Sequence, residues 1–263
     1  MSIMVKQNKK DKIVTLVMLG ITGILLLTLS IVFRDSLISS LQNNFVKGDN
    51  YLELLKGLLN TFLITIVAFI MGLFLGAIVC CIEGSQSQNV FILILKKLSK
   101  VYVSIFRGTP ATVQLLIIYF VLFAFFSGDP IYIAMLAFGL NSGAYVSEIL
   151  RGGIQAVPKG QMEAGRSLGL SYGTVMRKII FPQAIKNALP SLGNEFITLI
   201  KETSVAGFIG AIDLTLAFRK IATATYDFKT VYLVMGAVYF IIVLLITIGL
   251  KQIERKLVKH AKS

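Results

Sequence analysis

Long stretches without a charged side chain constrain the fold of this chain more than any other feature. Five of them occur, at residues 13–33, 58–82, 110–126, 131–147 and 231–250. Each is near or above the roughly 20 apolar residues that an α-helix needs to cross the ~30 Å hydrocarbon layer of a membrane. Because a lipid-embedded backbone must satisfy its own hydrogen bonds, the sequence predicts an all-α polytopic membrane protein.

A sixth stretch, residues 192–212, is long enough to span but carries Glu195, Lys201 and Glu202. We therefore expect six transmembrane helices. With 56% hydrophobic and 15% charged residues, the chain is not expected to fold as a soluble domain. Residues 1–33 also look like a signal peptide, but the apolar run is long and no small-residue cleavage site follows it. An uncleaved first helix is favoured, and its removal would leave five spans in the same orientation.

The formal net charge of +13 is distributed unevenly along the chain. Lysine and arginine gather before the first predicted span, between the second and third, between the fourth and fifth, and after the last. Such segments lie on the cytoplasmic side of a membrane by the positive-inside rule. Both termini are therefore expected in the cytoplasm. The alternation also argues against a nucleic-acid partner, which would need one continuous basic face.

Residues 159–190 form a charged segment between hydrophobic spans, punctuated by glycine and proline. Gly169 falls where a left-handed residue ends a helix, and Ser171 can cap a second short helix that Pro182 interrupts. Pro190 then opens the fifth span. One interpretation is an ordinary amphipathic surface loop. So ordered a loop needs a partner for its apolar side, however, which favours a fixed surface presented to a soluble protein.

Two shorter patterns predict local packing. The segment 83–108 combines an apolar side with clustered lysines, including Lys96 and Lys100, which is typical of a helix lying on the inner leaflet. Gly72 and Gly76 form a GxxxG pattern within the second span, which allows a close helix approach.

The 159–190 segment resembles the EAA loop of ATP-binding-cassette (ABC) importer permeases. The residues that match its pattern are Glu163, Ala164, Gly165, Gly169, Ile179, Phe181 and Pro182. Gly165 stands in place of the second alanine and Phe181 in place of leucine. The stretch 107–110 (RGTP) with Gln114 and Leu115, and the residues flanking the loop, narrow the likeness to the polar amino acid permeases. It covers about four-fifths of the chain, from residue 51 to residue 255.

The resemblance implies a permease subunit that translocates a polar amino acid across the bacterial cytoplasmic membrane by alternating access. Each EAA loop would sit in a cleft of one subunit of an ABC ATPase dimer, and an extracytoplasmic binding protein would deliver the amino acid. The second permease would be the same chain or a related one. The sequence contains no Walker motif, so ATP and Mg would be bound by the partner ATPase, and neither enzymatic activity, a cofactor nor a metal site is expected in this chain.

The same resemblance implies how the chain is organised. Residues 1–50 would form a cytoplasmic tail, an extra transmembrane helix and an external connector. Residues 51–255 would form the five-helix type I importer core, with cytoplasmic coupling helices at 159–190. Residues 256–263 would form a basic cytoplasmic tail.

Charged residues inside a span are costly and therefore mark a candidate substrate site. Helical geometry places Glu195, Thr198 and Glu202 on one face of the fifth span, where a carboxylate could hold the ammonium group of an amino acid. The further candidates for substrate contact are Thr203, Ser204, Asn141 and, less favoured, Lys201. The alternative is structural: Lys201 and Glu202 would pair with each other, with Glu148 or with the second permease. For Glu148 the structural role is favoured.

Two other functions remain as alternatives at the level of sequence. An ion-coupled secondary carrier would use Glu195 and Glu202 as coupling groups and would need no ATPase. A membrane anchor for a cytoplasmic enzyme would leave the intramembrane charges dispensable.

Overall fold

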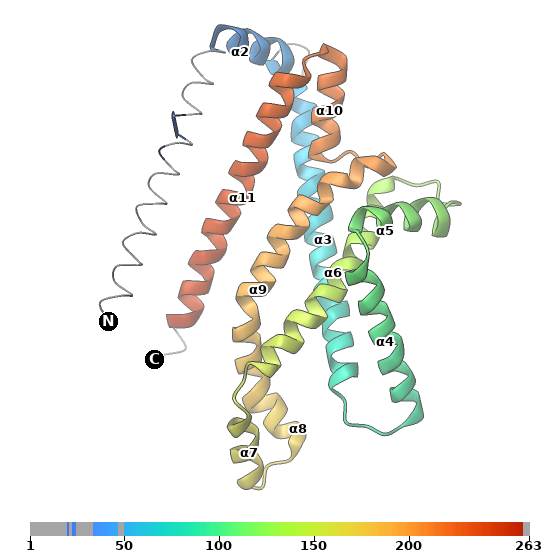
Figure 1. Cartoon of the computed structure of the whole chain (residues 1–263), viewed down its shortest axis with the longest axis vertical. Helices are drawn as coiled ribbons and strands as arrows, with labels where there is room; N and C mark the ends of the chain where they lie inside the picture. Colours follow the sequence, from blue (N-terminus) through green and yellow to red (C-terminus); the bar gives the residue numbers. More distant parts are fainter. Residues whose placement is uncertain (1–19, 21–22, 25–33, 47–49, 260–263) are drawn as a thin grey trace.

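The computed structural model describes residues 20, 23–24, 34–46 and 50–259 of the chain, and every regular element in these ranges is helical (Figure 1). The predicted first span, 13–33, lies almost wholly outside the described residues, as does the end of the predicted basic tail. The short helix α2 (Arg34–Leu41) and the π-helix η1 (Gln42–Val46) lie at one end of the molecule, and the 159–190 segment lies at the other.

Among the described residues, three helices are long and apolar enough to cross a membrane. They are α3 (Asn50–Gly84), α6 (Pro130–Gln155) and the part of α11 (Phe228–Lys259) that ends at Gln252. They contain the predicted spans 58–82, 131–147 and 231–250, which are confirmed. In Figure 1, α3 and α11 run lengthwise and α6 crosses α3 at an angle.

The region of the predicted third span differs from the prediction. Helix α4 (Val90–Gly108), from the segment predicted to lie on the inner leaflet, packs against α3 and α6. It then turns by 112° into α5 (Ala111–Ile117), which continues as the π-helix η3 (Ile118–Leu122). Only the two parts together are long and apolar enough for a span. The break falls at Pro110, which has no N–H to continue α4.

The 159–190 segment contains one short helix, a turn, and the start of a much longer helix. Helix α7 (Lys159–Ser167) ends at Gly169, whose φ of +78° is left-handed. The N–H of Leu170 then donates to the carbonyl of Gly165, which closes the helix end in a Schellman motif. Ser171 caps α8 (Tyr172–Val175) by accepting from the N–H of Thr174. We refer to residues 159–180, which include the π-helix η4 (Met176–Ile180), as the hairpin.

The two prolines behave differently from the prediction. Pro182 does not interrupt the helix but lies in the first turn of α9 (Phe181–Glu202), directly after η4. The wider turn of a π-helix relieves the clash between a proline ring and the preceding carbonyls. Pro190 lies inside α9 and does not open it. The helix is therefore continuous from Tyr172 to Glu202.

The predicted fifth span, 192–212, has the wrong bounds. Helix α9 ends at Glu202 and is followed by the 3₁₀-helix η5 (Thr203–Ile209) and by Gly210, whose φ is +83°. Helix α10 (Leu214–Thr225) then leads to α11, and it lies near α2 at the end opposite the hairpin (Figure 1).

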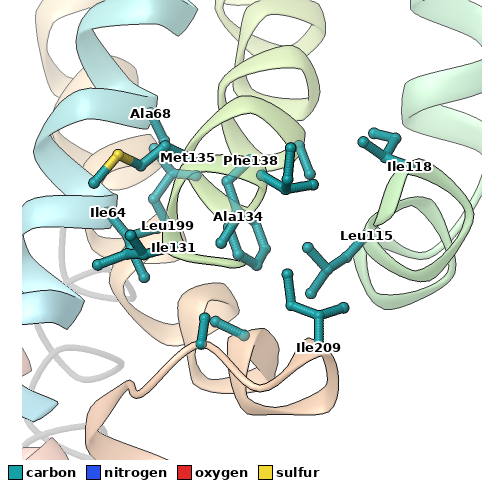
Figure 2. Close-up of a cluster of buried hydrophobic side chains, with 14 residues drawn as sticks. Ile64, Ala68, Leu115, Ile118, Ile131, Ala134, Met135, Phe138, Leu199 and Ile209 are labelled. Atoms are coloured by element: carbon teal, nitrogen blue, oxygen red, sulfur yellow. The ribbon is translucent and has the colours of Figure 1, made fainter. Parts of the chain in front are cut away.

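The main apolar cluster lies where α3, α5, η3, α6, α9 and η5 meet, and Figure 2 shows its side chains converging between these elements. It includes Ile64, Leu115, Phe138, Leu199 and Ile209, all at most 4% exposed. Because its α6 members lie in the first half of that helix, the cluster closes the bundle on the side away from the hairpin.

Candidate functional site

The predicted coupling residues lie on two different sides of the hairpin and at the start of α9. Glu163 and Ala164 of α7 are exposed, and Leu168 at its end has 80% of its surface exposed. Phe181 is 40% exposed and Pro182 is exposed as well. An apolar side chain as open as Leu168 is typical of a contact surface for another protein.

The inner side of the hairpin has its own small core. It consists of Val157, Val175, Ile180 and Ala184, with Ile179 and Met162 packed against them. Ile179 is thus a packing residue rather than part of the exposed surface. The core fixes the hairpin against the end of α6 and the start of α9, so that a force on the exposed surface reaches both helices.

Gly165 is buried because α7 and α8 approach each other closely at this point. A Cβ atom at Gly165 would lie 2.7 Å from Cγ2 of Val175, closer than side chains can pack. The glycine that replaces the second alanine of the pattern is therefore required by its neighbour.

Glu195 is the most deeply placed of the candidate substrate residues. Its side chain is 7% exposed, and one carboxylate oxygen accepts a 2.8 Å hydrogen bond from Oγ of Ser142 on α6. Among the described residues, no lysine or arginine lies within ion-pair distance of Glu195. A buried carboxylate with only a neutral donor is costly, which makes Glu195 a candidate site for a cationic group.

Thr198 and Glu202 follow Glu195 by about one and two turns of α9 and share its face, whereas the candidates Thr203 and Ser204 lie beyond α9, in η5. Thr203 is buried, and its hydroxyl donates to the carbonyl of Ile200 at 2.8 Å. Ser204 and Lys201 line a separate cavity of about 460 Å³ against α10 and α11. Thr198 and Glu202 are half-buried.

Asn141 neighbours Ser142 in sequence but faces a different set of residues. Its Nδ2 donates to Oε1 of Gln114 at 2.8 Å, while its buried Oδ1 has no hydrogen-bond partner in the described part of the chain. Gln114 in turn donates to the carbonyls of Phe106 and Thr109 at the break between α4 and α5. The QL part of the 107–115 pattern therefore stabilises the break.

Two cavities lie between Ser142 and the hairpin. The first, which we call the chamber, has a volume of about 430 Å³ and is lined by Tyr145, Asn187 and Ser191 among others. The second, the vestibule, has a volume of about 1370 Å³ and extends to the hairpin, where Met162 and Tyr172 line it.

Arg107 and Glu148 line both cavities and form an ion pair, with Nη1 of Arg107 3.0 Å from Oε2 of Glu148. Arg151 contacts the same carboxylate through Nη2 at 2.6 Å and through Nε at 3.0 Å. The structural role expected for Glu148 thus involves these arginines rather than Lys201 or Glu202. Arg107 belongs to the RGTP stretch and Ser142 to the residues that precede the loop, but these patterns assign neither residue to the site. Only the fold brings Arg107 to Glu148 and Ser142 to Glu195.

Comparison with known proteins agrees with this arrangement. Residues 89–259 match the family described as binding-protein-dependent transport system inner membrane component. The chain is 41% identical to the arginine transport system permease protein ArtQ of Bacillus subtilis, over 78% of this chain and 92% of that protein. It is 39% identical to a putative glutamine transport system permease protein GlnP of Rickettsia bellii, over 79% and 94%.

Solved structures agree as well. An amino acid ABC transporter crystallised with histidines is 39% identical, with a TM-score of 0.72, and the match covers 78% of this chain and 94% of that one. The methionine ABC transporter MetNI, in an inward-facing conformation, shares the fold at 21% identity with a TM-score of 0.64. The chain belongs to the binding-protein-dependent transport system inner membrane component family, among the permeases of amino acid ABC transporters.

Proposed function

We propose that this chain is the permease of an ATP-driven importer of polar amino acids and that Glu195 holds the α-ammonium group of the substrate during passage. The observation that carries the proposal is the buried Ser142–Glu195 pair, whose carboxylate has no basic partner among the described residues. An ammonium group would supply the missing positive charge at low dielectric, where such a pairing is strong. The names of the relatives, which include arginine and glutamine permeases, support a polar amino acid.

The surroundings of Glu195 support an alternating-access mechanism. The apolar cluster of Figure 2 closes the bundle on one side of the pair, while the chamber and the vestibule lie on the other. A substrate at Glu195 would therefore have access only to the hairpin side. Rocking of the helices around this fixed point would open the opposite side.

The hairpin would couple this motion to ATP hydrolysis in another protein. Its exposed surface, with Glu163, Ala164 and Leu168, would seat in a cleft of one subunit of an ABC ATPase dimer, where ATP and Mg are bound. Closure of two ATPases is a rigid-body motion that a seated helix can transmit. A second permease, identical or related, and an extracytoplasmic binding protein would complete the assembly.

The topology that accompanies this function has six transmembrane helices with both termini in the cytoplasm. Residues 1–50 would add one helix to the core at 51–255, and residues 256–263 would form a basic tail. The hairpin end would then be the cytoplasmic end. Its basic residues, such as Arg166, Arg177 and Lys178, support this orientation.

The test is transport by the complete complex in vesicles, with its ATPase and binding protein. We expect Glu195→Gln to weaken substrate-dependent ATP hydrolysis, with the half-maximal substrate concentration raised by about tenfold or more, because a charge-assisted hydrogen bond is lost. Glu53→Gln, which alters an exposed carboxylate at the opposite end, serves as the control. Equal responses of the two variants would contradict the role of Glu195.

The same vesicles separate the importer from a secondary carrier. Uptake should require ATP and should not follow an imposed proton or sodium gradient. Accumulation driven by such a gradient without ATP would contradict the proposal.

A further inference from the structure

The chamber lies directly beside the buried Ser142–Glu195 pair. Ser191 lines it and precedes Glu195 by about one turn of α9, and Tyr145 lines it and follows Ser142 by about one turn of α6. The chamber thus begins about one helical turn from the pair on the hairpin side, and it meets the vestibule at Arg107 and Glu148, which line both cavities.

The Arg107–Glu148 ion pair stands at the boundary between the two cavities, since both residues line both of them. Arg107 comes from the end of α4 and Glu148 from α6, so the pair also connects two helices. The guanidinium of Arg107 lies 5.7 Å from the ring centroid of Tyr145, within the range of a cation–π contact. Its position is thus fixed by two partners.

The lining of the vestibule has more positive than negative side chains, because the carboxylates of Glu83 and Glu148 face four cations, Lys100, Arg107, Arg151 and Lys159. Glu148 faces both Arg107 and Arg151, and the side chains of these arginines remain 43% and 44% exposed. A guanidinium has five N–H donors, of which Glu148 occupies only some. The cluster of Arg107, Glu148 and Arg151 is therefore prepared to accept a further carboxylate, and Glu148 can accept a further ammonium group.

We propose that Arg107 and Glu148 form a second binding site for a zwitterionic amino acid on its way out, which we call the exit station. The carboxylate of the amino acid would bind the guanidinium of Arg107. Its ammonium group would bind Glu148 in the place that Arg107 leaves. Arg151 would remain paired with Glu148. Positive and negative groups would then alternate from Arg151 through Glu148, the ammonium group and the carboxylate of the amino acid to Arg107. The exit station rests on the proposed function and adds a site that recognises the carboxylate, whereas Glu195 recognises the ammonium group.

The exit station predicts inhibition by product from the hairpin side. In vesicles that hold the complete complex, unlabelled L-arginine or L-glutamine on that side should slow uptake of the same labelled amino acid. The corresponding α-carboxamide lacks the carboxylate charge. Its half-inhibitory concentration should therefore be higher by about tenfold or more. This comparison uses the unaltered complex and therefore does not depend on the folding of a variant.

Substitution then locates the effect. Arg107→Gln should raise the half-inhibitory product concentration about tenfold and abolish the preference for the acid over the amide, while Arg107→Lys retains part of that preference. Lys97→Gln is the matched control, since Lys97 is an exposed cation of the same helix outside both cavities.

The outcomes distinguish the exit station from the proposed function. Suppose that the wild-type complex shows ATP-dependent uptake. Equal inhibition by acid and amide would then overturn the exit station alone, and so would equal responses of Arg107→Gln and Lys97→Gln. The ion pair would in that case be purely structural. Absence of ATP-dependent uptake of either amino acid by the wild-type complex would overturn both.

Discussion

At the scale of single residues, Gly165 shows how one position can depend on its neighbour. The EAA pattern has alanine here, but Val175 is fully buried against Gly165 and occupies the space of the missing methyl group. The identity of residue 165 is therefore tied to that of residue 175. A loop with alanine at 165 would need a smaller side chain at 175.

We predict that Gly165→Ala destabilises the hairpin by about 1–3 kcal/mol, as is usual for overpacking. Gly160→Ala in the same helix is the control, because a Cβ at Gly160 meets nothing within 4 Å. Thermal unfolding of the purified complex and ATP-dependent uptake measure the effect. The double variant Gly165→Ala/Val175→Ala should lose less stability than the two single changes added together. Indistinguishable behaviour of Gly165→Ala and Gly160→Ala would contradict the contact.

At the scale of elements, the packing of α3 against α6 determines where the Ser142–Glu195 pair lies. A Cβ at Gly72 would lie 2.6 Å from Oγ of Ser142, and one at Gly76 would lie 2.6 Å from Cγ1 of Val146. The GxxxG pattern thus brings the backbone of α3 against the α6 residue that donates to Glu195. The two glycines therefore account both for the close approach of α3 and α6 and for the position of Ser142.

We therefore expect Gly72→Ala in α3 to affect the hydrogen bond between Ser142 of α6 and Glu195 of α9. The added methyl group would displace Ser142 and break its hydrogen bond to Glu195, which should raise the substrate concentration for half-maximal ATP hydrolysis several-fold, about as much as loss of one hydrogen bond. Gly236→Ala in α11 is the control, because its Cβ has open space. Unchanged substrate dependence in Gly72→Ala would show that Ser142 is not positioned by this contact.

The sequence predicted elements best where a single residue type determines the local backbone. Gly169 and Ser171 take the predicted helix-ending and helix-capping roles, because left-handed geometry and a hydroxyl cap are local properties. The predictions that Pro182 interrupts a helix and that Pro190 opens one are wrong, since Pro182 lies in the first turn of α9 directly after a π-helix and Pro190 lies inside α9. Glu148 pairs with Arg107 and Arg151 rather than with Lys201, because such partners depend on tertiary packing, which no local pattern contains.

At the scale of the whole molecule, the two ends of the bundle differ. Apolar side chains from six elements close one side of the bundle (Figure 2), and both cavities lie toward the hairpin at the other side. If the hairpin lies in the cytoplasm, as proposed, this asymmetry would be that of an inward-facing state.

Chemical labelling tests the orientation of the whole chain. In a variant with Cys80 and Cys81 replaced by alanine, Thr223→Cys near the end of α10 should react with a membrane-impermeant maleimide in intact cells. Ser167→Cys in the hairpin should react only after the membrane is permeabilised. Both positions are exposed, so reactivity reports the side of the membrane. The reverse pattern would contradict a cytoplasmic hairpin.

The uninterrupted helix from Tyr172 to Glu202 has a mechanical consequence. If an ATPase pushes on the hairpin, as proposed, a helix that moves as one rod would shift Glu195 by the same amount and at the same moment. Any bending must therefore take place beyond the rod, in η5 and at Gly210, where the left-handed backbone interrupts helical stiffness.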